Sequence, residues 1–138
     1  MPVEAYLNFK GNCREAVEFY SQVFDTEKPH FMTFGEMPLG PESQFSLPDD
    51  LKDWIMHTRL TIHESNVMFS DVLPDMPFTV GNNISLTIVC DDREAIKQAF
   101  SKIKEGGTVK MELQQTFWSK CYGFVIDKFG IGWQFSLR

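Results

Sequence analysis

Apolar and polar residues alternate in several stretches of the chain, and the strictest alternation closes it. In GIGWQFSL, residues 130–137, every second side chain from Ile131 onward is apolar. Such alternation predicts a strand with one face in a core. We expect the apolar set to pack beneath helices and Gly132, Gln134 and Ser136 to face a cavity. Exposure of this second face to solvent is the alternative.

The first half of the chain has one stretch with helical periodicity and four that are typical of strands. Residues 11–24 repeat apolar side chains at helical spacing. Asn12 is the expected N-cap, and Glu15 stands three residues on, in the capping-box position. The predicted strands are residues 3–9, 28–34, 54–62 and 67–73. Residues 35–53 hold three prolines and two glycines, which predicts a long loop.

The second half repeats this order of strand, helix and three strands. Its predicted elements are a strand at 84–90, a helix at 91–107 with an Asp cap and a Gly stop, and strands at 108–113, 121–127 and 131–137. The helices share similar letters, REAV at 14–17 and REAI at 93–96. We therefore predict an internal duplication, with modules at 1–73 and 84–138 joined by a linker at 74–83.

Composition and charge limit the class of protein. The 138 residues are 43% hydrophobic, enough for one well-filled domain, and the net charge of −6 comes with no basic run. We therefore expect neither nucleic acid nor a membrane as a partner. The opening MPVEAYLNF has no signal-peptide pattern, which predicts a cytoplasmic protein. Three cysteines without CxxC or Cys/His spacing predict no disulfide framework and no structural zinc.

Several motifs make the whole chain resemble a known family. YLNFKGNCREAVEFYSQVF opens the first half, MHTRL precedes a hairpin, and YGFVIDKFGIGWQF ends the second half. These motifs resemble the vicinal oxygen chelate superfamily, which includes glyoxalase I, extradiol dioxygenases and bleomycin-resistance proteins, and within it the PhnB-like branch, often labelled 3-demethylubiquinone-9 3-methyltransferase-like. The resemblance implies an α+β fold of two tandem βαβββ modules forming a curved mixed sheet around a cavity.

Metal-using members of this superfamily hold a divalent ion with four side chains, two from each module. The resemblance places these positions on Ala5, near Phe69 with Asp71 as the nearest carboxylate, on Ser85 and on Gln134. Only Gln134 is a credible donor, and a single amide does not hold a divalent ion. We therefore expect no metal, although His57 is the strongest argument against this expectation.

The branch label also implies S-adenosylmethionine as a cofactor. No Gly-x-Gly-x-Gly turn follows a predicted strand, and the order of elements is not that of a doubly wound parallel sheet. EGGTV, at 105–109, follows a helix and is interpreted as a turn. We therefore expect no cofactor and no methyl transfer.

A group of aromatic and polar residues is the candidate ligand site, because pockets for small molecules combine stacking surfaces with a few fixed polar groups. The expected ligand-binding residues are Phe34, Trp54, His57, Arg59, Trp118, Tyr122 and Gln134. His57 and Glu36 are the candidate acid–base pair. Trp54, Trp118 and Tyr122 serve only as loop anchors or interface residues in the alternative interpretation.

Two departures from the branch pattern remove charge from the expected cavity. Ser119, Lys120 and Cys121 stand where branch members often have Asp and Arg, and Gly132 replaces a common basic residue. These differences favour a neutral or aromatic ligand. The sequence thus predicts a homodimeric, metal-free protein that binds a small organic molecule. An enzyme of lyase, isomerase or dioxygenase type and a drug-sequestering protein stay open as alternatives.

Overall fold

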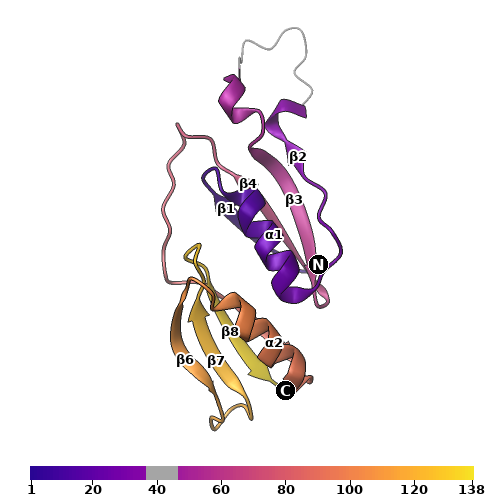
Figure 1. Cartoon of the computed structure of the whole chain (residues 1–138), viewed down its shortest axis with the longest axis vertical. Coiled ribbons are helices and arrows are strands. Elements are labelled where there is room, and N and C mark those ends of the chain that lie inside the picture. Colours follow the sequence, from indigo (N-terminus) through magenta and orange to yellow (C-terminus); the bar gives the residue numbers. More distant parts are fainter. Residues whose placement is uncertain (37–46) are drawn as a thin grey trace. The chain divides into compact units, whose positions relative to one another are not determined.

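The computed structural model describes residues 1–36 and 47–138, and these form two compact α+β units (Figure 1). Unit 1 spans residues 1–78 and unit 2 spans residues 79–138. The boundary between them falls inside the stretch that the sequence marks as a linker, residues 74–83. Part of the predicted long loop, residues 37–46, lies outside the described residues.

Each unit consists of one strand, one helix and three further strands. Unit 1 contains β1 (Ala5–Phe9), α1 (Cys13–Phe24), β2 (Met32–Thr33), β3 (Ile55–Ile62) and β4 (Ser65–Asp71), with short 3-10 turns at Phe34–Glu36 and Asp49–Leu51. Unit 2 contains β5 (Ser85–Cys90), α2 (Arg93–Ile103), β6 (Thr108–Gln114), β7 (Tyr122–Ile126) and β8 (Gly132–Leu137).

The two sheets share one topology. Strand order is β1-β4-β3-β2 in unit 1 and β5-β8-β7-β6 in unit 2. The first and last strands of each unit pair in parallel, and the remaining pairs are antiparallel. The predicted repetition of a βαβββ module is confirmed.

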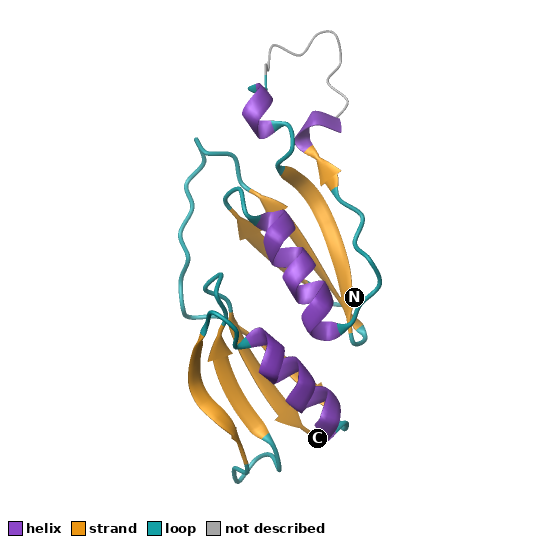
Figure 2. Cartoon of the chain, viewed as in Figure 1, coloured by secondary structure: helices purple, strands orange, loops and turns teal. Residues whose placement is uncertain are grey.

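In unit 1, α1 covers one face of the sheet and buries an apolar stripe against it (Figure 2). The ring of Tyr20 stacks on Phe69 of β4 with 5.9 Å between centroids, and Phe69 in turn stacks on Phe9. Because side chains alternate along a strand, the residues on either side of Phe69 in β4, and the residue before Phe9 in β1, point to the opposite face of the sheet. We call this opposite face, in each unit, the helix-free face.

In unit 2, α2 packs on β7 and β8 in the same way. Phe100 of α2 meets Phe135 of β8 edge to face at 5.7 Å, and Trp133 beside it is 1% exposed. Burial of these two strand residues under a helix confirms that part of the prediction for the closing segment. Gln134 and Ser136 therefore lie on the helix-free face of unit 2.

The start of α1 differs from the prediction. The side chain of Asn12 caps no helical N–H and instead accepts a hydrogen bond from the Lys10 backbone N–H. The carboxylate of Asp71, at the end of β4, accepts from the N–H groups of Gly11, Cys13 and Ile55 at 2.8–3.0 Å. The capping-box prediction was wrong because a distant carboxylate satisfies the helix start.

The start of α2 agrees with its prediction. The Asp92 side chain accepts a hydrogen bond from the Ala95 N–H at 3.2 Å. The helix ends at Ile103, earlier than predicted, and Gly106 adopts φ +72° in the turn that follows. Positive φ is the backbone region that glycine enters without a steric penalty.

The strand predicted at 28–34 was mostly wrong, because β2 pairs with β3 only at Met32 and Thr33 and a register shift lies between them. The preceding chain approaches β3 through a side chain instead, since Thr58 Oγ1 donates to the His30 carbonyl at 2.8 Å. The hairpin after β3 is also tighter than predicted. Ile62 pairs with Ser65, which leaves a turn of only His63, at φ +54°, and Glu64.

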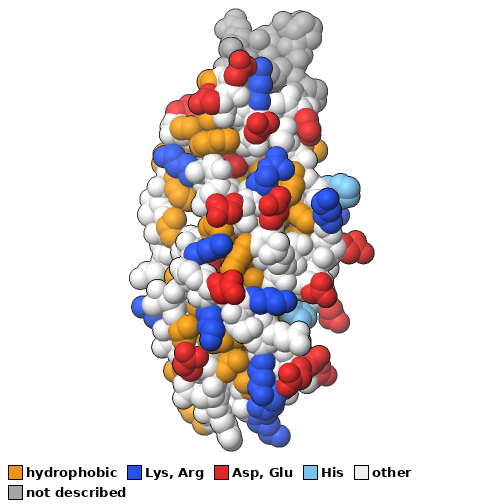
Figure 3. Space-filling model, viewed as in Figure 1, with side chains coloured by type: hydrophobic (Ala, Val, Ile, Leu, Met, Phe, Trp, Pro, Cys, Tyr) orange, Lys and Arg blue, Asp and Glu red, His pale blue; other side chains and the backbone are white. Residues whose placement is uncertain are grey.

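Charge on the face shown in Figure 3 is mixed, with acidic and basic side chains interspersed over both units. Within residues 1–36 and 47–138, none of the helices has the length and apolar character needed to span a bilayer.

Candidate functional site

The helix-free face of unit 2 brings polar groups from three neighbouring strands into register. Gln134 on β8 stands opposite Thr87 on β5 and Phe124 on β7. Tyr122, two residues before Phe124, and Ser85, two residues before Thr87, lie on the same face. Two of the predicted ligand-binding residues, Tyr122 and Gln134, are thus brought together.

A hydrogen-bond chain crosses these strands. The Tyr122 hydroxyl donates to Gln134 Oε1, and Gln134 Nε2 donates to Ser85 Oγ at 2.7 Å. The two bonds fix which end of the amide faces each strand. We call this arrangement the Tyr122–Gln134–Ser85 chain. Neither of its bonds involves a charged group, so it presents a fixed, neutral polar surface.

Exposed aromatic rings extend this surface at the loop between β6 and β7. Trp118 meets Tyr122 edge to face at 5.1 Å and is 52% exposed. Phe117 meets Trp118 at 4.7 Å and is 97% exposed. Thr116 and Ser119 close this loop with a backbone hydrogen bond of 2.8 Å, so the two rings project from a short, internally bonded turn.

The helix-free face of unit 1 carries ionisable groups instead. His57 and Arg59 of β3 share this face, because side chains alternate along the strand, and β4 lies beside them. The Tyr6 hydroxyl on β1 lies 3.5 Å from His57 Nδ1. The same face also holds a bond from Ser70 Oγ to Asn8 Oδ1 at 3.1 Å.

A groove of about 790 Å³ lies between β3 and the segment that follows α1, residues 24–30. His57 and Arg59 line it, together with His30 and His63. Both His30 and His63 are exposed. His30 reaches the groove because the segment after α1 runs back along β3, whereas His63 stands in the hairpin turn that follows β3.

The other predicted site residues of unit 1 make loop contacts. A methyl group added to Gly11 would lie 2.8 Å from the Trp54 ring, so Trp54 packs closely on the turn before α1. The Phe34 N–H donates to the Trp54 carbonyl at 2.9 Å. Glu36 is exposed, and its carboxylate lies 3.5 Å from the Thr33 N–H. No contact between Glu36 and His57 is found in the part of the chain that the structure describes.

The positions that the resemblance implies for a metal carry apolar residues in unit 1 and a hydrogen-bonded pair in unit 2. In unit 1, Phe69 lies on the face that packs against α1, because its ring contacts Tyr20 of α1. Ala5 lies on the same face, because Leu7, two residues after it in β1, pairs with Phe69. In unit 2, Ser85 and Gln134 do share the helix-free face, but they are hydrogen-bonded to each other. Across residues 1–36 and 47–138, no group of three or more His, Cys, Asp or Glu is placed to hold an ion.

Comparison with known proteins places this arrangement in a family. The family model described as 3-demethylubiquinone-9 3-methyltransferase matches residues 2–136. Protein YjdN from Escherichia coli (strain K12) is 32% identical over 99% of this chain and 95% of its own length.

Solved structures agree with this match. Protein PA1353 from Pseudomonas aeruginosa superposes with a TM-score of 0.85 at 32% identity, covering 100% of this chain and 98% of that one. A putative 3-demethylubiquinone-9 3-methyltransferase, PhnB protein, from Bacillus cereus gives a TM-score of 0.70 at 24% identity, with both chains covered completely. The chain therefore belongs to the 3-demethylubiquinone-9 3-methyltransferase family, the PhnB-like branch of the vicinal oxygen chelate superfamily, with the glyoxalase/bleomycin resistance-like fold.

Proposed function

We propose that this protein binds a small, neutral, aromatic organic molecule on the helix-free face of unit 2, without a metal ion. The observation that carries this proposal is the Tyr122–Gln134–Ser85 chain flanked by the exposed ring of Trp118. A flat apolar ligand would stack on Trp118 and Phe117 and direct one polar group to the chain.

The hydrogen-bond capacity of the chain supports a neutral ligand. The Gln134 amide has two N–H donors and uses one of them on Ser85, while the hydroxyls of Ser85 and Tyr122 keep acceptor capacity. An ion placed against this surface would lose hydration, and the Tyr122–Gln134–Ser85 chain offers no opposite charge in return. Such a loss of hydration costs free energy. A ligand with one neutral donor or acceptor loses less.

Metal-assisted chemistry receives no support from the donor set. The amide oxygen of Gln134 already accepts a hydrogen bond from the Tyr122 hydroxyl. The metal positions that the resemblance implies in unit 1 are Ala5 and Phe69, on the helix-packed face. This donor set therefore does not fit a divalent ion.

Methyl transfer, which the family description implies, does not fit either strand-to-helix turn. The turn before α1 has one glycine, Gly11, and the Trp54 ring occupies the space beside it. The turn before α2 holds Asp91 and Asp92, and the Asp92 carboxylate caps the helix. Neither turn offers the glycine-rich backbone approach that nucleotide cofactors use.

Acid–base catalysis in unit 1 is the second candidate function, and the contact between Tyr6 and His57 favours it. Imidazole and phenol groups both donate and accept protons, so this pair at the edge of a groove has the chemistry that acid–base catalysis needs. This enzyme would be of lyase or isomerase type. It predicts turnover that is lost in His57→Gln, whereas the binding proposal predicts no dependence on His57.

The binding proposal is tested by NMR with ¹⁵N-labelled protein and three probes, indole, quinoline and 2-naphthol. We expect at least one probe to give saturable shifts at the Gln134 side-chain amide and at the Ser85 backbone. Trp118→Ala should weaken that binding by about tenfold, the effect of losing one stacking partner and its buried area. Lys110→Ala, a change at an exposed position of the neighbouring β6, is the control.

Saturable shifts confined to other regions, or equal affinity in Trp118→Ala, would contradict the proposal.

We also propose that the chain acts in the cytoplasm as a homodimer, as the family resemblance implies. Exposed apolar side chains such as Ile84, 78% exposed, and Val89, 48% exposed, are consistent with a partner surface. Light scattering coupled to gel filtration should give twice the chain mass, and a monomer mass would exclude the dimer.

A further inference from the structure

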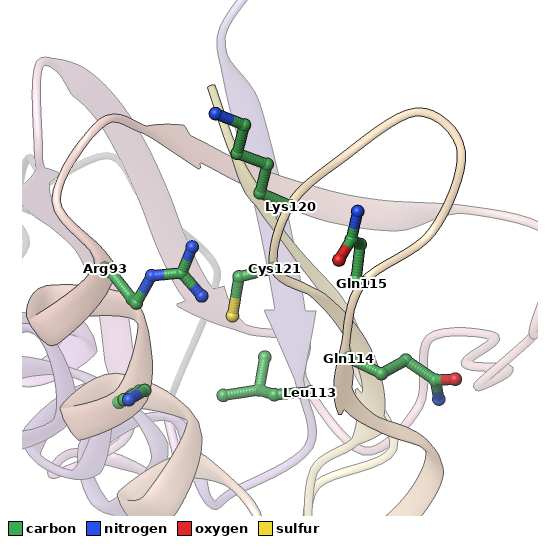
Figure 4. Close-up of a pocket in the computed structure, with 7 residues that line it drawn as sticks. Arg93, Leu113, Gln114, Gln115, Lys120 and Cys121 are labelled. Atoms are coloured by element: carbon green, nitrogen blue, oxygen red, sulfur yellow. The ribbon is translucent and has the colours of Figure 1, made fainter.

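A pocket in unit 2 lies between the start of α2 and the loop that follows β6 (Figure 4). Its volume is about 450 Å³. Three basic side chains line it: Arg93 and Lys97 from α2, and Lys120 from the loop. The remaining lining residues are Leu113, Gln114, Gln115 and Cys121.

The pocket is positively charged in an acidic protein. None of its lining residues is Asp or Glu, whereas the whole chain has a net charge of −6. Lys97 Nζ lies 3.9 Å from Glu94 Oε1, and this ion pair is on the exposed surface of α2. For Arg93 and Lys120, the described residues contain no ion-pair partner. Like charges gathered without countercharge repel one another, and a bound anion would relieve that repulsion.

The side chains are arranged around a partly apolar floor. Figure 4 shows the Arg93 guanidinium directed from α2 towards the Cys121 sulfur, with Gln115 on the other side of the pocket and Gln114 pointing away. Cys121 is 4% exposed and forms part of the floor. Figure 4 draws the Lys120 side chain leading from its loop away from the Cys121 sulfur, and rotation about its flexible four-carbon stem would bring the ammonium group to an occupant.

Neighbouring acidic groups do not fill this pocket. The Asp92 carboxylate, just before Arg93, is engaged with the Ala95 N–H and is not a lining residue. Arginine matches phosphate and carboxylate groups with two parallel N–H donors, and lysine adds a mobile positive charge. A guanidinium and two ammonium groups around one pocket are therefore suited to an oxyanion.

We propose that this pocket binds a small molecule through its phosphate or carboxylate group, with Arg93 and Lys120 as the main contacts and Lys97 as a supporting charge. The site is separate from the one proposed above, because α2 covers the opposite face of the sheet from the Tyr122–Gln134–Ser85 chain. The protein would then bind an anion on the helix side and a neutral ligand on the helix-free face.

Titration of the ¹⁵N-labelled chain with inorganic phosphate, and separately with citrate, tests this proposal at constant ionic strength set by sodium chloride. We expect saturable shifts at the backbone amides of Gln115, Lys120 and Cys121. The double variant Arg93→Gln/Lys120→Gln should bind at least about tenfold more weakly, because each charged hydrogen bond contributes substantially to affinity.

The control is Lys102→Gln/Lys110→Gln, which removes two exposed positive charges from unit 2 outside the pocket. It should keep the wild-type affinity. Three outcomes would overturn the proposal: no saturation by either anion, unchanged affinity in the pocket variant, or equal weakening in both double variants, which would indicate general screening. All substituted residues are exposed, so the spectra of the variants verify that each remains folded.

Discussion

The two units share a strand order but secure the start of their helices in different ways. In unit 1 a carboxylate from the last strand, Asp71, accepts from backbone N–H groups at the start of α1. In unit 2 a local residue, Asp92, caps α2, and the buried carboxylate is Asp127. Asp127 accepts from two backbone N–H groups of the turn before β8 and from Trp133 Nε1. The same topology is therefore stabilised by buried carboxylates at non-equivalent places.

The helix-free faces differ as well. Unit 1 presents His57 and Arg59, whereas unit 2 presents the neutral Tyr122–Gln134–Ser85 chain beside exposed rings. The duplicated topology determines where side chains point but not what they are. Chemistry must therefore be assigned to each face separately.

The largest expected difference is in the reactivity of two cysteines. Cys13 of unit 1 is fully buried, and burial, with a smaller contribution from Asp71, raises the pKa of its thiol. Cys90 of unit 2 is partly exposed. Cys13 should react with iodoacetamide at least about a thousandfold more slowly than Cys90, because its reaction requires unfolding. Mass spectrometry of peptides after timed quenching measures both rates.

The raised thiol pKa also predicts a dependence of stability on pH. The folded state holds the Cys13 proton more tightly than the unfolded state does. The contribution of this thiol to the free energy of unfolding is thus fully present below the pKa of the unfolded thiol, about 8.5, and is lost as the pH rises above that value. Cys13→Ala should show a smaller loss between neutral and alkaline pH. Equal slopes, or rapid alkylation of Cys13, would contradict its burial.

The next effect is the loss of a buried carboxylate. Asp71→Asn and Asp127→Asn should each lower the free energy of unfolding by about 3 kcal/mol, since each carboxylate accepts several hydrogen bonds inside the protein. Urea unfolding measures the cost. Hydrogen exchange should increase mainly in unit 1 for the first variant and in unit 2 for the second.

Asp49→Asn is the control for the carboxylate variants. Asp49 is fully exposed, and its pKa is lowered by a hydrogen bond from the side chain of Lys52, which is also exposed. Its replacement should change stability little. If Asp71→Asn cost no more than this control, the carboxylate would not secure the start of α1.

The smallest effect separates the two predicted N-caps. Asp92→Ala should cost about 1 kcal/mol, because it removes a real cap from α2. Asn12→Ala should cost roughly half of that or less, because the Asn12 side chain bonds only the Lys10 N–H outside the helix. Both are measured by urea unfolding. A larger cost for Asn12→Ala would restore the capping role that its sequence position implies.

Local patterns were sufficient to predict the modules and most strands. Alternation identified β3 and β8, and helical periodicity together with a local Asp identified α2, because these signals act between near neighbours in the sequence. The cap of α1 was missed because Asp71 is far from Cys13 in the chain. The strand before residue 34 was overestimated because β2 ends at a register shift that residue composition does not reveal.

The site was predicted in part for similar reasons. Tyr122, Gln134 and Trp118 come together because they follow the register of adjacent strands and a short loop. Trp54 packs on the turn at Gly11, a contact that depends on a glycine with φ +90°. Ala5 and Phe69, the metal positions that the resemblance implied in unit 1, lie on the helix-packed face, and alternation along a strand does not by itself reveal which face a helix covers.

The most direct test of the proposed binding site compares matched tyrosines in the two units. Tyr122→Phe removes the hydroxyl that donates to Gln134, whereas Tyr6→Phe removes the hydroxyl beside His57. The measurement is the calorimetric affinity of both variants for whichever of indole, quinoline and 2-naphthol binds the wild type best. We predict about tenfold weaker binding for Tyr122→Phe and wild-type affinity for Tyr6→Phe. Unchanged affinity in Tyr122→Phe, or an equal or larger loss in Tyr6→Phe, would contradict the assignment of ligand binding to unit 2.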